Sequence, residues 1–354
     1  MTPLPISRPS YAPVIEFTRG QIVESFHGGA VAVVDTQGRL VAAYGDPRTV
    51  TFLRSSAKPF QTLPLVESGA LEKFGITPRE LAVTCASHLG MDMHVETVSG
   101  LQRKIGVSES DLMCGTHPVG DAATAERLNR EGQAPTPLRH NCSGKHTGMM
   151  AQARFRGVTI ADYISPQHPV QQTILQTFAE MCGMAPEDVV VGIDGCSVPT
   201  FAVPLQQAAL AYSRLADSRS MPEKRAAALR TIYAAMTTNP EMVRGPGGFD
   251  TEVMRLGGSL VVSKSGAEAF VGLGLAPGAC GPNSPALGVA IKIGDGGERA
   301  DMMVAAEVLR QLGVLGQDQI AKLVELGLGP GRVLKNFRGL VVGEARPCFE
   351  LRRF

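Results

Sequence analysis

Residues 28–45 read GGAVAVVDTQGRLVAAYG, two β-rich runs on either side of a turn at residues 36–38. This pattern predicts a β-hairpin. Towards the other end of the chain, short apolar runs at residues 259–264, 269–274 and 287–293 predict three further strands. Strands therefore gather at both ends of the chain, with helical patterns in the middle. We expect an α/β layered fold, with a central sheet built from N- and C-terminal strands, flanking helices and a helical insertion.

The helical patterns lie mostly between these strands. Residues 170–183 (VQQTILQTFAEMCG) are amphipathic and end at a glycine, and residues 222–237 and 300–313 predict two more helices. Two other apolar segments, residues 81–88 (LAVTCASH) and 188–196 (DVVVGIDGC), predict buried strands followed by polar residues.

The composition is that of an ordinary globular protein. The 354 residues carry a formal net charge of +1, and 44% of them are hydrophobic. This charge balance gives no electrostatic reason to expect nucleic acid or an anionic membrane as a partner. We expect a single domain over residues 1–354, with room for a helical subdomain over about residues 95–240.

The N-terminus has no basic segment followed by an apolar core, so we expect that it is not a secretory signal. No apolar stretch reaches the roughly 18 residues that a membrane-spanning helix needs. The seven cysteines are scattered and odd in number, so we expect thiols or metal ligands rather than disulfides. These features together predict a cytoplasmic protein.

The first candidate for chemistry is Ser55 with Lys58, in the run RSSAKP. At the start of a helix, positions i and i+3 share a face, so the Lys58 amine can reach the Ser55 hydroxyl. A serine is a poor nucleophile without a base, and a lysine is a base only when burial or a nearby cation lowers its pKa. The alternative is that Ser55 or Ser56 caps the helix and Lys58 is solvated.

Two further segments can contribute hydroxyl and amine groups. Residues 85–88 (CASH) follow an apolar run, a common place for site residues, and the alternative is a small-residue turn with His88 in the core. Lys264 ends the run SLVVSK and precedes Ser-Gly, which resembles the K-[ST]-G element of penicillin-recognising serine enzymes. The alternative is an edge-strand lysine that prevents aggregation.

A third group of residues suggests a metal. In residues 141–146 (NCSGKH), Cys142 and His146 have the i, i+4 spacing of metal ligands, while the alternative is a buried thiol. The run lacks the first glycine and the Ser/Thr of a phosphate-binding P-loop. Asp194 and Cys196 follow another apolar run, and Cys196 can complete a thiolate metal site with Cys142.

Taken together, these segments resemble the asparaginase II family, the rhizobial-type, zinc-containing L-asparaginases. The resemblance covers nearly the whole chain. The matching stretches, in the family's order, are FHGGAVAVVD, RSSAKPFQ, CASHLG, HNCSGKHTGMM, GIDGCSVPTFAVPL, GGFDTEVM, KSGAEAF, GVAIKIGDG and RGLVVGE. The combination of HNCSGKH, GIDGC and RSSAKP is specific. Ala269 stands where the family usually has glycine, away from the candidate residues.

The resemblance implies a fold like that of serine β-lactamases and related glutaminases, with two Ser-Lys pairs. Ser55 with Lys58 matches the first pair and Ser87 with Lys264 the second. The resemblance also implies Zn²⁺ as cofactor. Its implied ligands are Cys142, Lys145 and Cys196, whereas the spacing alone favoured His146 over the lysine. A lysine ligand must be neutral, which requires a strongly lowered pKa.

From this resemblance we predict an L-asparaginase acting on a small-molecule substrate, and we expect a homodimer. In the predicted mechanism Ser55 attacks the side-chain amide of L-asparagine and neutral Lys58 accepts its proton. Ser87 and Lys264 then relay a proton to the leaving ammonia. The candidate substrate-binding residues are Arg54, His88 and Asp194, with Arg54 and Asp194 as candidate partners for the α-carboxylate and the α-ammonium of the substrate.

Two alternatives remain open at the level of sequence. A glutaminase or a penicillin-recognising serine hydrolase can use the same Ser-Lys pairs. A zinc-thiolate sensor without catalysis is the alternative from another class, and the neutral charge and lack of a basic stripe argue against it.

Overall fold

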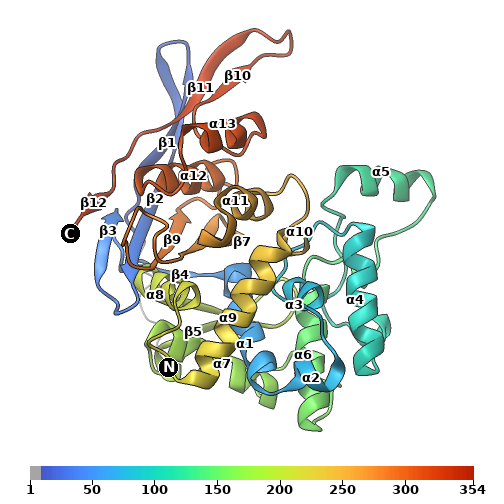
Figure 1. The fold of residues 1–354 in the computed structure, drawn as a ribbon. Helices are drawn as coiled ribbons and strands as arrows, with labels where there is room; N and C mark the ends of the chain where they lie inside the picture. Colours follow the sequence, from blue (N-terminus) through green and yellow to red (C-terminus); the bar gives the residue numbers. More distant parts are fainter. Residues whose placement is uncertain (1–8) are drawn as a thin grey trace, which may run out of the picture.

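The computed structural model describes residues 9–354. The prediction that the N-terminus carries no secretory signal concerns a segment that lies partly outside these described residues. Its main sheet has the order β10-β11-β1-β2-β9-β8-β7, with β3 paired to β2 and β12 paired to β3. In Figure 1 the blue N-terminal strands lie among the orange and red C-terminal ones. The predicted α/β fold, with a sheet built from both ends of the chain, is confirmed.

All pairings given for this sheet are antiparallel. Its strands are β1 (Ala12–Arg19), β2 (Ile22–Asp35), β3 (Leu40–Tyr44), β7 (Val261–Gly266), β8 (Phe270–Leu275), β9 (Leu287–Ile293), β10 (Arg332–Lys335), β11 (Val341–Pro347) and β12 (Arg352–Arg353). The predicted hairpin is formed by β2 and β3, and the three predicted C-terminal strands are β7, β8 and β9.

Side chains alternate between two cores across β2. Ala30, Ala32 and Val34 point into a core shared with the helical half of the molecule. Val31 and Val33 point into a second core on the opposite face. This period of two is what a strand buried on both faces requires.

Helices cover both faces of the sheet. Helix α8 (Leu205–Ala216) packs on β2, β8 and β9, and helix α12 (Asp301–Gln311) packs against β1, β8 and β9. The approach of α8 depends on Gly288, because a Cβ at that position would lie 1.8 Å from the backbone oxygen of Ala209. Sheet and helices thus form the layers that the sequence predicts.

The other helices lie below and to the right of the main sheet in Figure 1. They are α1 (Lys58–Glu67), α2 (Ala70–Phe74), α3 (Pro78–Thr84), α4 (Asp92–Ile105), α5 (Ala122–Arg130), α6 (Ser143–Arg156), α7 (Pro169–Cys182), α9 (Glu223–Thr238), α10 (Pro240–Val243) and α11 (Phe249–Gly257), with α13 (Gln317–Glu325) beside α12. The helices predicted at residues 170–183, 222–237 and 300–313 are confirmed as α7, α9 and α12. Helices α1 and α3 lie before residue 95 yet pack on α6, α7 and α9, so the helical part extends beyond the predicted subdomain.

A second, three-stranded sheet has the order β4-β6-β5. Its strands are β4 (Val50–Phe52), β5 (Val190–Ile193) and β6 (Pro199–Pro204). The strand predicted within residues 188–196 is therefore present, but its predicted burial is wrong. Because β5 is an edge strand, Val190, Val191 and Ile193 are 53%, 42% and 60% exposed.

The strand predicted at residues 81–88 is wrong, because residues 78–84 form helix α3. The Thr77 side chain accepts the Glu80 backbone N–H, and the Glu80 carboxylate accepts the Thr77 backbone N–H. This capping box starts the helix. Leu81, Ala82 and Val83 are all buried, so the run lacks the polar face that distinguishes a surface helix from a buried strand.

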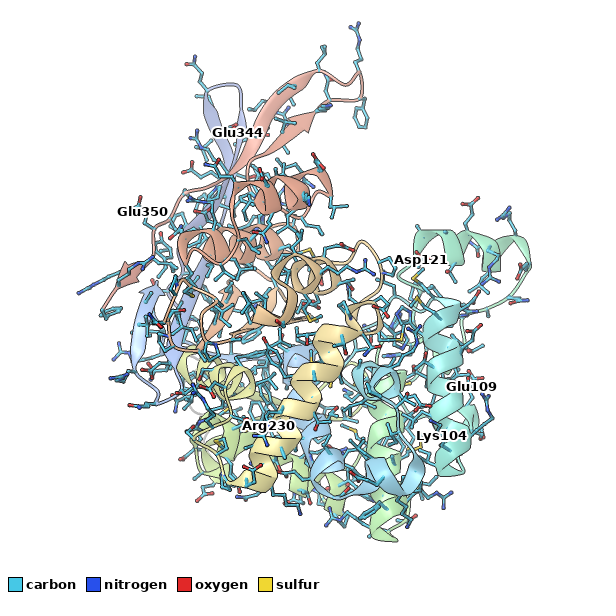
Figure 2. The ribbon with its side chains drawn as sticks, viewed as in Figure 1. Lys104, Glu109, Asp121, Arg230, Glu344 and Glu350 are labelled. Carbon is cyan, nitrogen blue, oxygen red and sulfur yellow. The ribbon has the colours of Figure 1, made fainter. Side chains whose placement is uncertain are left out.

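Charged side chains such as Lys104, Arg230 and Glu350 lie around the periphery of the molecule (Figure 2). Among the described residues, no helix has both the length and the apolar character needed to span a membrane.

Candidate active site

Ser55 and Lys58 lie where the chain passes from the three-stranded sheet into helix α1. A short 3-10 helix, η1 (Arg54–Ala57), leads into α1, and the Lys58 side chain is fully buried. Arg54 has a left-handed φ of 51°, a strained conformation that clusters at functional sites. Neither serine caps a helix, because Ser56 Oγ donates a 2.6 Å hydrogen bond to the Lys264 carbonyl and Ser55 makes no cap bond. The alternative of a capping serine beside a solvated lysine is wrong.

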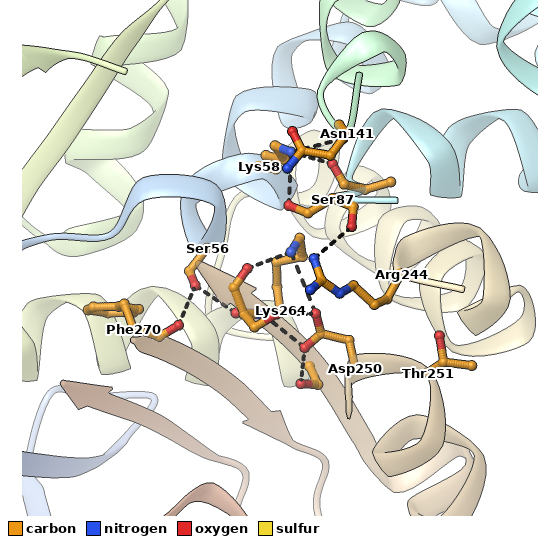
Figure 3. A network of polar contacts seen from close by, with 12 residues as sticks. Ser56, Lys58, Ser87, Asn141, Arg244, Asp250, Thr251, Lys264 and Phe270 are labelled. Atoms are coloured by element: carbon orange, nitrogen blue, oxygen red, sulfur yellow. Dashed lines mark hydrogen bonds and ion pairs between the residues drawn. The ribbon is translucent and has the colours of Figure 1, made fainter. Parts of the chain in front are cut away.

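Lys58 contacts the Ser87 hydroxyl rather than that of Ser55. Its Nζ lies 3.0 Å from Ser87 Oγ and 3.4 Å from the Asn141 carbonyl oxygen, and it also donates to the Ala86 carbonyl (Figure 3). Carbonyl oxygens only accept hydrogen bonds. A neutral Lys58 therefore uses its two N–H groups on the carbonyls and directs its lone pair to the Ser87 hydroxyl. Ser87 is the hydroxyl whose proton Lys58 can accept directly.

Lys264 lies inside strand β7 and is also fully buried. Its Nζ donates to the Ser265 carbonyl at 2.5 Å and lies 3.5 Å from the Asp250 carboxylate. Within residues 9–354 its amine has no hydrogen bond to Ser87. The two predicted Ser-Lys pairs are thus not the hydrogen-bonded pairs of this structure, in which Ser87 is bonded to Lys58.

Burial lowers the pKa values of both lysines. The pKa of Lys58 falls mainly through desolvation, against the opposing effect of the nearby Cys142 sulfur. Burial lowers the pKa of Lys264 to about 7, although the Asp250 carboxylate acts in the opposite direction. Lys264 can therefore exchange a proton near neutral pH.

Asp250, in the first turn of α11, anchors the segment around Lys264. Its carboxylate accepts hydrogen bonds from Ser263 Oγ at 2.6 Å, from the Ser265 backbone N–H at 2.8 Å and from Ser265 Oγ at 2.6 Å (Figure 3). The side chain is fully buried. Burial would raise the pKa of Asp250, but the Lys264 amine together with these hydrogen bonds outweighs it and holds that pKa below its ordinary value.

The three predicted substrate-binding residues make contacts within the protein. Arg54 and Asp194 form an ion pair with 2.7 Å between Nη2 and Oδ1. His88 is buried, and its ring nitrogens bond Ser143 Oγ at 2.9 Å and the Gly90 backbone N–H at 3.1 Å. His88 thus has the arrangement of a satisfied core histidine, and the substrate-binding role of all three residues stays a prediction.

A cavity of about 90 Å³ brings together residues from six segments of the chain. The residues that line it include Ser55, Ser87, Asn141, Arg244, Glu298 and Asp301. Drug-sized ligands occupy pockets of roughly 300–1,000 Å³, so this cavity suits a much smaller molecule. A larger surface hollow lies beside α12 and the C-terminal segment, away from the serines and lysines described above.

Two thiols and an amine converge next to this site. Lys145 Nζ lies 2.9 Å from Cys196 Sγ, and all three side chains, those of Cys142, Lys145 and Cys196, are buried. A hydrogen bond from Cys196 lowers the pKa of Cys142. Burial alone would lower the pKa of Lys145, but the two sulfurs outweigh it and raise that pKa. These shifts favour an ammonium on Lys145 beside a thiolate on Cys142.

Sulfur and nitrogen donors are those that zinc prefers, and their convergence in a buried cluster fits a zinc site. Among residues 9–354 no cluster contains three His, Cys, Asp or Glu side chains, so a zinc here would need the Lys145 amine as its third ligand in neutral form. His146, the alternative ligand, instead bonds the Tyr163 hydroxyl through Nδ1 at 2.7 Å.

The family model of L-asparaginase II matches residues 15–347, nearly the whole chain. The chain belongs to the L-asparaginase II family. This membership confirms the resemblance noted in the sequence and makes the chain an amidohydrolase. A search of curated proteins finds no match.

Solved structures give more distant similarities to this asparaginase II chain. The glutaminase YbgJ of Bacillus subtilis, in a covalent complex with 5-oxo-L-norleucine, has 12% identity and a TM-score of 0.38 over 80% of this chain and 86% of its own. A β-lactamase of Mycobacterium bovis has 14% identity and a TM-score of 0.42 over 85% of this chain and 95% of its own. These are the protein classes that the sequence resemblance names, but at such TM-scores the family match alone carries the assignment.

Three residues in or beside this candidate site escaped the sequence reasoning: Asp250, Arg244 and Asp301. Asp250 falls in the stretch GGFDTEVM, but an acidic residue in the first turn of a helix is usually explained by the helix dipole. Arg244 precedes a glycine-rich loop, and Asp301 opens a helix. Nothing in their spacing relates them to Ser55 or Ser87.

Proposed function

We propose that this chain is an L-asparaginase that hydrolyses L-asparagine to L-aspartate and ammonia through a serine nucleophile. The observation that carries the proposal is the buried hydrogen bond between Lys58 and Ser87, at the wall of a small cavity that Ser55 also lines. A hydroxyl becomes a nucleophile when a neutral amine accepts its proton, and burial of Lys58 favours the neutral amine. The small volume of the cavity favours a small substrate such as L-asparagine.

In the proposed reaction Ser55 Oγ attacks the side-chain amide carbon. Its proton passes to the Ser87 hydroxyl as Ser87 gives its own proton to Lys58. The protonated Lys58 returns a proton through Ser87 to the amide nitrogen, with Lys264 as a second proton carrier, and ammonia leaves. A water molecule then attacks the resulting ester by the same proton path in reverse, which frees L-aspartate and restores Ser55.

Zinc belongs to this proposal as a bound cofactor that Cys142, Lys145 and Cys196 would hold. When bound, it would supply a fixed positive charge beside the cavity and act as a Lewis acid. The predicted homodimer and cytoplasmic location also stay proposals, which light scattering of the purified protein and cell fractionation test.

The test of the function measures ammonia release from L-asparagine and from L-glutamine, with samples that lack enzyme as controls. Hydrolysis of a chromogenic β-lactam is followed separately by its colour change. We expect L-asparagine to be turned over fastest. Fast turnover of L-glutamine or of the β-lactam, without turnover of L-asparagine, would move the chain to one of the alternative hydrolases.

The test of the nucleophile compares Ser55→Ala with Ser56→Ala. Loss of a nucleophile typically costs several orders of magnitude in kcat. Ser56 is bonded to the Lys264 carbonyl instead, so Ser56→Ala is expected to keep substantial activity. Lys58→Met is expected to be nearly as damaging as Ser55→Ala, and Lys58→Arg not to rescue activity, because an arginine does not become neutral.

Ser87 is the second candidate for the nucleophile, because it is the serine bonded to Lys58. A diazoketone analogue of L-asparagine alkylates a nucleophilic hydroxyl, and peptide mass spectrometry then locates the label. Label on Ser55 supports the proton path above. Label on Ser87, with turnover surviving in Ser55→Ala, would reverse the roles of the two serines.

A further inference from the structure

Two side chains of opposite charge border the cavity, and each lacks an ionic partner in the protein. The first is Asp301, at the start of helix α12, which is 2% exposed. Within residues 9–354 its carboxylate accepts one hydrogen bond, from the Met302 backbone N–H at 2.7 Å, and forms no salt bridge. By comparison, Asp250 accepts several hydrogen bonds and has Lys264 beside it.

The second is Arg244, between helices α10 and α11. Its Nη1 donates to the Ser87 carbonyl at 3.2 Å, which directs the guanidinium towards the serines (Figure 3). Over the part of the chain that the structure describes, no carboxylate lies within salt-bridge distance of it. Arg54, by contrast, already has Asp194 as its counter-ion.

A buried carboxylate without a cation is costly, because desolvation disfavours its charged form. Accordingly, burial raises the pKa of Asp301 to about 7, with the nearby Glu298 carboxylate acting in the same direction and the Arg244 guanidinium opposing it only weakly. A ligand that brings an ammonium group to Asp301 and a carboxylate to Arg244 would give each side chain the ionic partner that it lacks within the protein. The zwitterion of a free α-amino acid carries these two groups on one carbon atom.

We propose that Arg244 binds the α-carboxylate and Asp301 the α-ammonium of a free amino acid, and that this pair of contacts selects free asparagine over asparagine within a peptide. A peptide-linked residue carries two neutral amides in place of the two charges. The proposal rests on the proposed function in one respect, since it places the side-chain amide against Ser55 and Ser87 of the same cavity.

The experiment measures binding rather than turnover. Calorimetry uses a Ser55→Ala, Ser87→Ala protein, which lacks the two candidate nucleophiles, with three ligands. L-Asparagine has both charged groups, succinamate lacks the ammonium, and 3-aminopropanamide lacks the carboxylate. Each ligand is titrated into this protein and into the same protein with Arg244→Met or Asp301→Asn.

A matched pattern is expected. Each charged hydrogen-bonded contact is worth roughly 10- to 100-fold in Kd. Asp301→Asn should therefore weaken L-asparagine and 3-aminopropanamide by that factor but leave succinamate nearly unchanged. Arg244→Met should weaken L-asparagine and succinamate but leave 3-aminopropanamide nearly unchanged, and Arg244→Lys should restore part of the loss.

Exposed residues of the same types supply the controls. Asp318→Asn in α13 and Arg338→Met in the β10–β11 turn lie far along the chain from the cavity lining and are exposed. They should leave all three Kd values unchanged. Thermal melts of every variant identify any that fail to fold, and Arg244→Lys then carries the test for that position.

The proposal is overturned if all three ligands lose affinity equally in each variant, or if no ligand binds at millimolar concentration. It is also overturned if Arg54→Met and Asp194→Asn, rather than Arg244→Met and Asp301→Asn, give the matched pattern. Ammonia release from L-asparagine by the unmodified chain distinguishes failure of this binding proposal from failure of the proposed hydrolase function. Normal release with an unmatched binding pattern refutes only the amino-acid contacts, and a matched pattern without release refutes only the hydrolase.

Discussion

Replacing Asp250 by asparagine tests whether this carboxylate holds the Lys264 segment in place. Asp250 is fully buried and accepts hydrogen bonds from Ser263 Oγ, the Ser265 N–H and Ser265 Oγ, with the Lys264 amine 3.5 Å away. Asparagine has the same shape but only one acceptor oxygen. Its NH₂ group would face a hydrogen-bond donor wherever the amide is oriented, and Lys264 would lose its counter-ion.

Removing one partner of a buried ion pair costs about 3–5 kcal/mol of the free energy of unfolding. An unfolding entropy of about 2.1 cal/mol/K per residue over 354 residues amounts to about 0.74 kcal/mol/K. Asp250→Asn should therefore lower Tm by about 4–7 °C in differential scanning calorimetry. Because Asp250 also raises the pKa of Lys264, the pH dependence of kcat should shift to lower pH.

Asp318→Asn is the matched control, since the same change at an exposed position should alter Tm by less than about 1 °C. The reasoning is refuted if Asp250→Asn melts within about 1 °C of the unmodified chain. It is also refuted if Tm falls as expected while the pH profile of kcat stays where it was, because Asp250 would then act on the fold and not on Lys264.

Three further predictions concern titration and metal. The pKa of Asp301 is raised from 3.8 to about 7, so its contribution to the free energy of unfolding is fully present below about pH 4 and is lost progressively as pH rises to 7. Melts at pH 5 and 8 should therefore show Asp301→Asn gaining more stability over the unmodified chain at pH 8 than at pH 5, and an equal gain at both would contradict the titration of Asp301. Because burial lowers the pKa of Lys264 to about 7, kcat should rise as pH passes through that value. Lys264→Met should abolish this rise, and a rise that survives in the variant assigns the titration to another group. Protein purified without chelator should hold about one zinc per chain by elemental analysis, and Cys142→Ser should retain less; well under one zinc in the unmodified chain contradicts the metal site.

The main sheet was predictable because its signal is local. Residues 28–45 contain two β-rich runs around a turn, and this pattern is visible in the sequence without knowledge of any partner strand. The order of strands was predictable only in outline. That β2 pairs with β9, across more than 250 residues, depends on burial of both faces and not on any local pattern.

The segment at residues 81–88 shows where the local signal is ambiguous. A fully buried helix and a fully buried strand both appear as a short apolar run. The Thr-Pro-Arg-Glu sequence at residues 77–80 was the available signal, since Ser/Thr followed three residues later by Glu is the pattern of a capping box. Giving this pattern more weight than the apolar run would have predicted α3.

Sequence spacing could not predict which hydroxyl bonds to which amine, because it shows only which side chains are near enough to meet. Lys58 is three residues from Ser55, yet the carbonyls of Ala86 and Asn141 orient its amine towards Ser87. Those carbonyls come from two segments that meet only in the folded chain. In the proposed mechanism Lys58 serves Ser55 through the Ser87 hydroxyl, and a Ser87→Ala variant tests this against direct action of Lys58 on Ser55. If Lys58 acts directly on Ser55, Ser87→Ala keeps most of its kcat; if the proton passes through Ser87, kcat falls nearly as far as in Lys58→Met.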